Sequence, residues 1–363
     1  MNTNIKRLGD ICIVRRGTTI TQKEARDGNI PVVGGGVKPS YFHDQPNRKG
    51  NTITVSASGA SAGFINFYIE PIFASDCSTV EPKDNSVDVR YIYRAMQNLQ
   101  PYIYAKLKAG AAQPHVYAKD IAELEIPIPT LKEQQRIAGV LDTADRTIKL
   151  RESAIAKLDQ LTHSVFEDMF GSTKDNPKKF ATKKLKEIIK FEGGSQPPAS
   201  TFSDSESDGF IRLVQIRDFR TDKYKTYIPK NLAKRFFNSD DVMIGRYGPP
   251  VFQIFRGLSG SYNVALMKAN PSEFVTKDFV YYLLQENYLH SFVVANSERT
   301  AGQSGVNLDL LENYTAYLPP LELQKKFTLA ISQYQDLKLN FMESHKNLRH
   351  LFSSLQHQSF SVN

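Results

Sequence analysis

An internal repeat restricts the fold of this chain more than any other feature of its sequence. The segment IPIPTLKEQQRIAGVL, from Ile126 to Leu141, has a second version, YLPPLELQKKFTLAI, from Tyr317 to Ile331. The two copies stay aligned without a gap over a long stretch, beginning at Gln113 in the first half and at Gln303 in the second. A repeat of this length indicates that one structural plan is used twice.

Both copies continue into a stripe of apolar residues that recur at steps of four and three. Such a stripe is typical of a helix in a coiled coil, and the alternative is that it covers only a local domain core. A helix of about 38 residues, at ~1.5 Å per residue, would be roughly 57 Å long. Polar residues at Arg151, Lys338 and His345 interrupt the stripe, and such residues can set the register of a pair. The predicted seam consists of Ile137, Leu141, Ile148, Ile155, Leu158, Val165, Phe327, Ile331, Phe341, Leu348, Phe352 and Leu355.

A globular part precedes each predicted helix. Short alternating runs such as NTITVSA, GFINFYI and FIRLVQI predict strands joined by Gly, Ser and Asn turns. One helix is expected in each half, near DVRYIYRAMQNL and TKDFVYYLLQENYLHSFV. The expected division is 1–130 (globular), 131–171 (long helix), 172–320 (linker and second globular part) and 321–363 (long helix). Gly171 and Pro177 predict the end of the first long helix.

Gly-rich loops interrupt both globular parts at corresponding places, and each loop is either a tight turn or a site that approaches a phosphate backbone. The net charge of +8 and the pI of about 9.2 suit a polyanionic partner. Basic, amide and aromatic side chains beside these loops can reach base edges. Gln113 and Gln303 can alternatively bond to backbone. The candidate nucleic-acid contacts are Lys38, Tyr41, Ser58, Lys108, Gln113, His115, Arg217, Arg246, Tyr247, Arg299 and Gln303.

Several catalytic signatures are missing from the sequence. There is no Gly-Lys dipeptide for a P-loop, no dinucleotide-binding fingerprint, and no adenine-methyltransferase motif of the Asn/Asp-Pro-Pro-aromatic type. Asp76, Glu81 and Lys83 are the one nuclease-like combination, but Pro82 removes a backbone donor that the strand of such a site needs. The histidines at 345, 350 and 357 do not share one helical face. Catalytic residues and metal ligands are therefore predicted to be absent from this chain.

The plan of this chain resembles the DNA specificity (S) subunit of type I restriction–modification systems. The resemblance covers the whole chain and is carried by AQPHVYAKDIAELEIPIPTLKEQQRIAGVLDTAD, by its second copy LPPLELQKKF, and by the strand–turn units TITVSASGASAG and VMIGRYG. It implies an α+β fold in which two target recognition domains alternate with two long spacer helices. If these helices pair as an antiparallel coiled coil, the molecule would be pseudo-two-fold and near-circular.

The resemblance also implies a function for the assembly. The chain would read a bipartite, asymmetric site on double-stranded DNA. It would dock two adenine methyltransferase (M) subunits and could recruit restriction and motor (R) subunits in host defence. S-adenosylmethionine, ATP and Mg²⁺ would be bound by those partners, and no cofactor by this chain. The alternatives are a self-contained Mg²⁺-dependent nuclease and a coiled-coil scaffold that binds only protein. No signal peptide or membrane span is predicted, which favours a cytoplasmic location.

Overall fold

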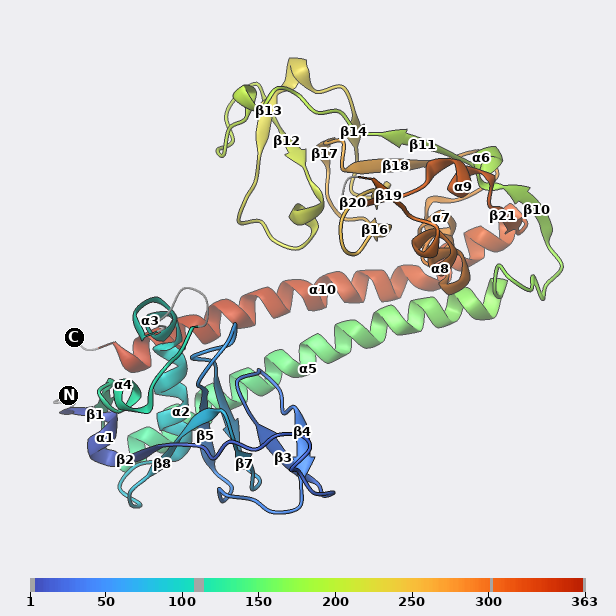
Figure 1. Cartoon of the computed structure of the whole chain (residues 1–363). Coiled ribbons are helices and arrows are strands. Elements are labelled where there is room, and N and C mark those ends of the chain that lie inside the picture. The colour runs from blue at the N-terminus through green and yellow to red at the C-terminus, as the bar shows by residue number, and fades with distance from the viewer. Residues whose placement is uncertain (1–3, 108–113, 301–302, 362–363) are drawn as a thin grey trace. The chain divides into compact units, whose positions relative to one another are not determined.

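The computed structural model describes residues 4–107, 114–300 and 303–361, and it divides into two compact units. Unit 1 comprises Met1–Ala154 and Phe341–Asn363, and unit 2 comprises Ile155–Asn340. Each unit therefore combines a globular part with portions of both long helices (Figure 1). Because these units group the segments differently, the domain limits expected from the sequence stay a prediction.

The globular part of unit 1 contains two sheets. The larger one is antiparallel, with the order β2 (Cys12–Arg16), β8 (Cys77–Pro82), β5 (Thr52–Ser56), β6 (Ile65–Tyr68). The smaller one has the order β4 (Tyr41–His43), β3 (Ile30–Val33), β7 (Phe73–Ala74), and its β3–β7 pair is parallel. A separate ribbon pairs β1 (Asn4–Arg7) with β9 (Glu125–Ile128). The helical segments are α1 (Leu8–Ile11), α2 (Val89–Asn98), α3 (Gln100–Tyr102), the π-turn Ile103–Leu107 and α4 (Ala118–Ala122).

Unit 2 repeats this topology. Its larger sheet has the equivalent order β11 (Ile189–Gly193), β18 (Leu266–Pro271), β15 (Val242–Gly245), β16 (Gln253–Phe255). The second sheet is β13 (Tyr227–Pro229), β12 (Phe210–Val214), β17 (Gly260–Tyr262), β14 (Phe236–Phe237), with a parallel β12–β17 pair. The ribbons are β10 (Ala181–Lys184) with β21 (Thr315–Leu318), and β19 (Glu298–Thr300) with β20 (Gln303–Gly305). The helices are α6 (Leu185–Ile188), α7 (Lys277–Leu283), α8 (Asn287–Ala295) and α9 (Leu308–Asn313), with 3-10 turns at Ala199–Thr201, Ile216–Phe219 and Lys230–Leu232.

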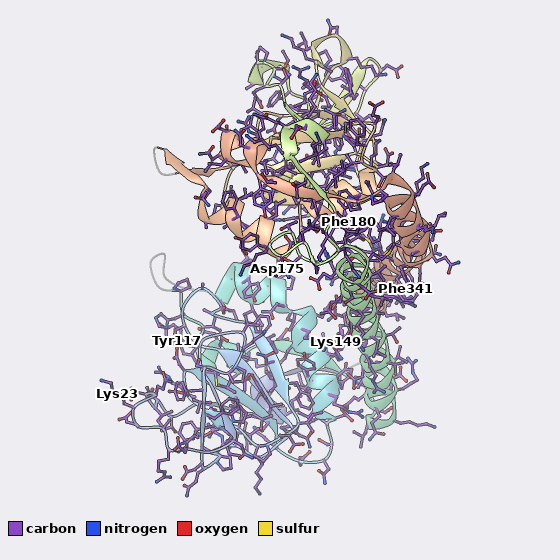
Figure 2. All side chains as sticks on the ribbon, turned by 90° about the vertical axis from the view of Figure 1, so that its right-hand side faces the viewer. Lys23, Tyr117, Lys149, Asp175, Phe180 and Phe341 are labelled. Atoms are coloured by element: carbon purple, nitrogen blue, oxygen red, sulfur yellow. The ribbon has the colours of Figure 1, made fainter. Side chains whose placement is uncertain are left out.

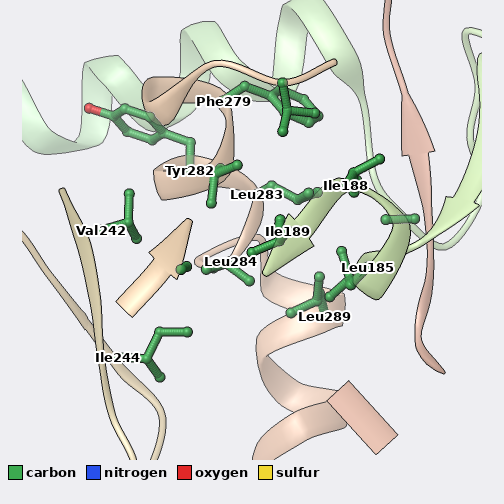
Figure 3. Close-up of a cluster of buried hydrophobic side chains, with 14 of the residues drawn as sticks. Leu185, Ile188, Ile189, Val242, Ile244, Phe279, Tyr282, Leu283, Leu284 and Leu289 are labelled. Carbon is green, nitrogen blue, oxygen red and sulfur yellow. The ribbon is translucent and has the colours of Figure 1, made fainter. Parts of the chain in front are cut away.

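Burial on both faces explains the composition of the central strands. In β5 all five residues are buried, and its side chains alternate between β-branched apolar residues and small hydroxyl residues. Ile53 and Val55 belong to the hydrophobic core that α2 covers, whereas Thr54 pairs across the sheet with Thr79 of β8. In unit 2 the corresponding core gathers Val242 and Ile244 of β15 with residues of α6, α7 and α8 (Figure 3).

The single helix expected over TKDFVYYLLQENYLHSFV is wrong, because the structure has two helices there. Helix α7 ends at Leu283, and α8 begins at Asn287. The carboxylate of Glu286 accepts a hydrogen bond from the backbone N–H of Leu289 at 3.0 Å, which caps a new helix. This interruption places Leu284 and Leu289 in the same core. None of the described helices is long and apolar enough to cross a membrane.

The two long helices are α5 (Leu131–Phe170) and α10 (Leu321–Phe360), each of 40 residues. Gly171 follows α5 with φ of +77°, a left-handed conformation that favours glycine and ends the helix. In unit 1 the guanidinium of Arg151 lies 4.1 Å from the centre of the Phe341 ring. Figure 2 labels Lys149 on α5 and Phe341 on α10. Since Phe360 contacts the core beside Ile137 and Leu141, the two segments run in opposite directions in this unit.

The same antiparallel relation holds in unit 2, where Lys338 pairs with Asp159 and Phe327 packs on Phe166 and Phe170. Every side chain predicted for the seam is buried or half-buried. Near the ends of the helices, these side chains also cover the core of a globular part. The alternative interpretation of the stripe, that it covers a local domain core, therefore applies there. The near-circular, pseudo-two-fold arrangement of the whole chain stays a prediction.

Polar contacts hold α5 to the globular part of unit 1. Arg94 of α2 is buried, and its guanidinium donates to Asp142 at 2.8 Å and to Asp145 at 3.1 Å. The equivalent place in unit 2 holds Tyr282 in a cluster of aromatic rings that includes Phe166 and Phe327. The first attachment therefore adds buried ion pairs to its apolar contacts, whereas the second adds aromatic packing.

Unit 1 is consequently expected to lose stability in acid. Burial by itself would raise the pKa of Asp145, but hydrogen bonds from Lys149 and Arg94 outweigh it and hold the pKa below its ordinary value. A lowered folded-state pKa contributes stability above the unfolded pKa near 4, and this contribution disappears as the pH falls through the folded pKa. Asp145→Asn should cost about 1–3 kcal/mol at pH 7 and progressively less below pH 4, as measured by thermal unfolding. Asp168→Asn, at an exposed site of the same helix, is the control, and an equal loss at every pH would contradict the prediction.

Candidate nucleic-acid interface

In each unit, the chain just after an inner strand of the larger sheet (β5 or β15) is hydrogen-bonded to the segment that leads into the long helix. We call this end of the inner strands the sheet edge. In unit 1, Ser58 forms an isolated antiparallel bridge with His115, and the Val116 N–H donates to the Ala57 carbonyl at 3.0 Å. In unit 2, Tyr247 forms the corresponding bridge with Gly305, and the Val306 N–H donates to the Arg246 carbonyl at 2.9 Å. The structure thus brings predicted contact residues from distant loops to one edge in both units.

The unit 1 edge cluster consists of Arg16, Ser58, Asp76 and His115. The Ser58 hydroxyl donates to the Asp76 carboxylate, and an Arg16 guanidinium nitrogen lies 3.8 Å from the other carboxylate oxygen. The His115 ring stacks on Tyr117, with their centres 6.2 Å apart. Donors, an acceptor and an aromatic face are therefore presented together, as base-edge recognition requires.

A glycine loop lies against this cluster. A Cβ on Gly35 would approach the Ser58 carbonyl oxygen to 2.9 Å, so a larger residue there would force a shift. The Gly36 carbonyl accepts from the Ser56 hydroxyl at 3.3 Å, and the Val37 carbonyl accepts from the Asn66 amide at 2.9 Å. Lys38 is exposed on this loop, where its ammonium can reach a phosphate.

The unit 2 edge cluster consists of Arg246, Tyr247, Gly193 and Gly305. The Arg246 guanidinium lies 5.2 Å from the centre of the Tyr247 ring, and this ring is 37% exposed. A Cβ on Gly305 would come within 3.2 Å of the Tyr247 ring, so glycine makes room for it. The cation over the ring restricts the arginine, which lowers the entropy that it would lose on binding a base.

Two predicted residues have other contacts. The Tyr41 hydroxyl donates to the Ile20 carbonyl at 2.5 Å, and burial, with a smaller effect of Glu24, raises its pKa. Arg217 is exposed and donates to the Tyr224 carbonyl at 3.4 Å. Arg217 lines a hollow of about 550 Å³ whose other charged residues are Asp204, Glu206, Asp222, Lys223 and Lys225, so charges of both signs lie around this arginine.

The remaining predicted contacts are described in part or not at all. Lys108 and Gln113 lie outside the described residues. Arg299 and Gln303 are placed by their backbone in β19 and β20, where Arg299 pairs with Ser304 and Gln303 pairs with Thr300. The bridge between Tyr247 and Gly305 brings the end of β20 to the unit 2 edge cluster.

The nuclease-like residues have structural partners. Glu81 lies 3.1 Å from Arg15 and 3.4 Å from Arg48, and the Lys83 ammonium donates to the Gly9 carbonyl at 2.6 Å. Asp76 belongs to the edge cluster through Ser58. In the part of the chain that the structure describes, no group of three or more His, Cys, Asp or Glu side chains gathers as a metal site would require.

Sequence reasoning missed Arg16 and Tyr117 as members of the site. Arg16 ends β2 immediately before Gly17, and the matching strand β11 ends at Gly193 beside Arg246. The sequence signal that could have identified Arg16 is an arginine at the end of a strand, next to a glycine. Its significance depends on the contact with Asp76, which is distant in the sequence.

Comparison with known proteins agrees with this architecture. The family model described as "Type I restriction modification DNA specificity domain" matches residues 2–160 and 177–348. A type I restriction enzyme MjaVIII specificity subunit of Methanocaldococcus jannaschii is 22% identical over 317 residues, which cover 79% of this chain and 73% of that protein. A putative type I specificity subunit of Mycoplasma genitalium is 28% identical over 174 residues, or 46% of this chain and 45% of that protein.

A solved structure shows the same fold. The crystal structure of the type I restriction–modification system S subunit from M. genitalium superposes with a TM-score of 0.68 at 18% identity, and the match covers 100% of this chain and 97% of that one. Mixed helix and sheet content and the repeated plan are therefore shared. The family match over both halves confirms the resemblance inferred from the sequence, and this chain belongs to the family of type I restriction–modification DNA specificity subunits.

Proposed function

We propose that this chain is the non-catalytic subunit that reads a bipartite, asymmetric DNA site for a type I restriction–modification complex. One observation carries the proposal: the same sheet edge occurs in both units, but with different side chains. Ala57 and Ser58 in unit 1 correspond through their backbone bonds to Arg246 and Tyr247 in unit 2. Two similar domains with different reading residues are suited to two different half-sites.

The chemistry of the two edge clusters supports different preferences. Arg246 can donate two hydrogen bonds to guanine O6 and N7 in the major groove. In unit 1, the Asp76 carboxylate can accept from cytosine N4, while Ser58 and Arg16 hold it in place. Lys38 can add a phosphate contact that positions the domain without reading sequence.

The long helices are proposed to form an antiparallel coiled coil that separates the two reading edges. The opposite directions of the helices within each unit support this, as do the pairs Arg151–Phe341 and Asp159–Lys338. A length of 40 residues corresponds to about 60 Å at 1.5 Å per residue. This exceeds one DNA turn of about 34–36 Å, so half-sites one turn or more apart can be reached.

The outer faces of these helices suit the docking of partner subunits. Leu150, Leu329 and Leu339 are 65%, 72% and 64% exposed, although they are large and apolar. A partner subunit that covers these leucines would remove their apolar surface from water, which favours docking. Methyltransferase subunits, and restriction and motor subunits with them, are the partners that this proposal assigns. S-adenosylmethionine, ATP and Mg²⁺ would be bound by those partners.

Replacement of Arg246 should affect one half-site only. Arg246→Ala removes a bidentate donor whose loss costs about 1–3 kcal/mol of discrimination, or roughly 5- to 150-fold. Sequencing of methylated adenines in a host that carries the variant should show relaxed bases in one half-site and an unchanged second half-site. Lys184→Ala, at an exposed position in ribbon β10–β21, is the control. Equal degradation of both half-sites would contradict a base-reading role.

The distance between the half-sites should follow the length of the helices. A heptad inserted into both α5 and α10 lengthens the pair by about 10.5 Å, which equals about three base pairs at 3.4 Å per base pair. Methylated sites should then keep both half-sites but gain about three base pairs between them. The same seven residues inserted after the exposed Ser205 should change nothing. An unchanged spacing in the helix variant would refute the spacer role.

A further inference from the structure

A buried glutamine occupies the first turn of each long helix. Gln134 is 1% exposed and Gln324 is 0% exposed, and they hold equivalent places in LKEQ and LELQ. Burial of a primary amide is unfavourable unless its donors and acceptor are paired. The hydrogen-bond partners of these two amides therefore explain why glutamine, and not an apolar residue, occupies each buried position.

Gln134 bonds to three backbone groups of unit 1. Its Oε1 accepts from the Asp88 N–H at 2.9 Å, and its Nε2 donates to the Pro129 carbonyl at 2.9 Å and to the Ser86 carbonyl at 3.5 Å. Asp88 is the N-cap of α2, and its carboxylate accepts from the N–H groups of Arg90 and Tyr91. The amide thus joins the start of the long helix to the start of the helix that covers the sheet.

Gln324 makes the same three connections in unit 2. Its Oε1 accepts from the Thr276 N–H at 2.9 Å, and its Nε2 donates to the Pro319 carbonyl at 2.9 Å and to the Phe274 carbonyl at 3.0 Å. Thr276 is the N-cap of α7, the counterpart of α2. The arrangement is therefore present twice, although most surrounding side chains differ.

Apart from the ion pairs of Arg94 with Asp142 and Asp145 in unit 1, the other contacts of these helices with the cores are mainly apolar and allow small shifts. Ile137, Ala138 and Leu141 bury α5 against the unit 1 core, and Phe327 and Ile331 do so for α10 in unit 2. Apolar burial is non-directional, whereas hydrogen bonds weaken steeply when their geometry departs from linear. Of the common side chains, only a primary amide offers an acceptor and two donors in one plane.

We infer that Gln134 and Gln324 are positioning residues that fix the angle at which each recognition domain meets its spacer helix. The amide acts through backbone groups and does not read bases. Given the proposed spacer function, on which this inference rests, the two glutamines determine how strictly the complex accepts one gap length between its half-sites. A loosened junction should widen the range of accepted gaps and leave the bases of both half-sites unchanged.

The test uses the purified complex of this chain with its methyltransferase subunits and a plasmid library. Each plasmid carries both half-sites, as found from the wild-type methylation pattern, separated by gaps that vary one base pair at a time. Gln134→Met keeps the length of the side chain and removes its hydrogen bonds. We expect methylation at gaps one base pair from the native one to rise at least tenfold relative to the native gap.

Matched controls lie on the same helices. Gln135→Met alters the exposed neighbour of Gln134 and should leave gap selectivity unchanged. Gln324→Met should widen the gap range as Gln134→Met does, whereas Gln333→Met, at an exposed position, should not. Wild-type selectivity in both buried variants, or a uniform loss of methylation at every gap by a variant that still folds and assembles, would overturn the inference. A wild-type complex that methylates no split site would instead overturn the proposed function.

A second variant keeps the test decisive where Gln134→Met fails to fold. Gln134→Glu retains an acceptor for the Asp88 N–H, but its carboxylate cannot donate to the Pro129 and Ser86 carbonyls. Burial beside these oxygens raises the pKa of the introduced acid, and its protonated form can donate one hydrogen bond. Gap selectivity of this variant should therefore improve as the pH is lowered through the pKa of the buried acid, whereas Gln135→Glu should show no such change. Selectivity that does not vary with pH in Gln134→Glu would overturn the inference.

Discussion

Each long helix closes two hydrophobic cores, and the rest of the structure depends on this sharing. Helix α5 contributes Ile137 and Leu141 to the core of unit 1, and Phe166 and Phe170 to the core of unit 2. Helix α10 does the reverse, because Phe327 and Ile331 lie in unit 2 and Phe360 lies in unit 1. A globular helix rarely needs 40 residues to cover one core. The length of each long helix follows from its contribution to two cores.

The two cores are attached to the long helices by different kinds of contact. In unit 1 the buried Arg94 binds Asp142 and Asp145, and in unit 2 Tyr282 packs among phenylalanine rings. Removing one partner of a buried ion pair leaves a charge without compensation, whereas truncating a ring leaves a cavity. The first attachment therefore contains an ion pair whose contribution depends on pH. The repeat preserves the topology of the junction while its chemistry has diverged.

The two edge clusters likewise share their backbone contacts and differ in their side chains. Equivalent backbone bonds tie the sheet edge to the approach of the helix in both units, through Val116 and through Val306. The side chains presented there differ, with Ser58 and Asp76 in one unit and Arg246 and Tyr247 in the other. A shared backbone scaffold that carries different side chains agrees with the membership of this chain in a family of specificity subunits.

Much of this organisation was predictable because it is written as local pattern. The repeat, the family and the apolar stripes could be read directly, since periodicity shows which face of a helix is apolar. The site was predicted less completely. Ser58, His115, Arg246 and Tyr247 lie at the two edge clusters, whereas the hydroxyl of Tyr41 donates to the Ile20 carbonyl. Their contact with DNA stays a prediction.

The sequence by itself determined that one plan is used twice and that a long amphipathic helix follows each copy. Only the tertiary structure decided which core each part of a helix covers, because an apolar stripe does not specify its partner. It also decided that Gln134 and Gln324 accept from the N–H groups of Asp88 and Thr276, since those groups are more than forty residues away in the chain. The physical reason is that hydrogen bonds and burial act between neighbours in space, and the order of residues records only neighbours along the chain.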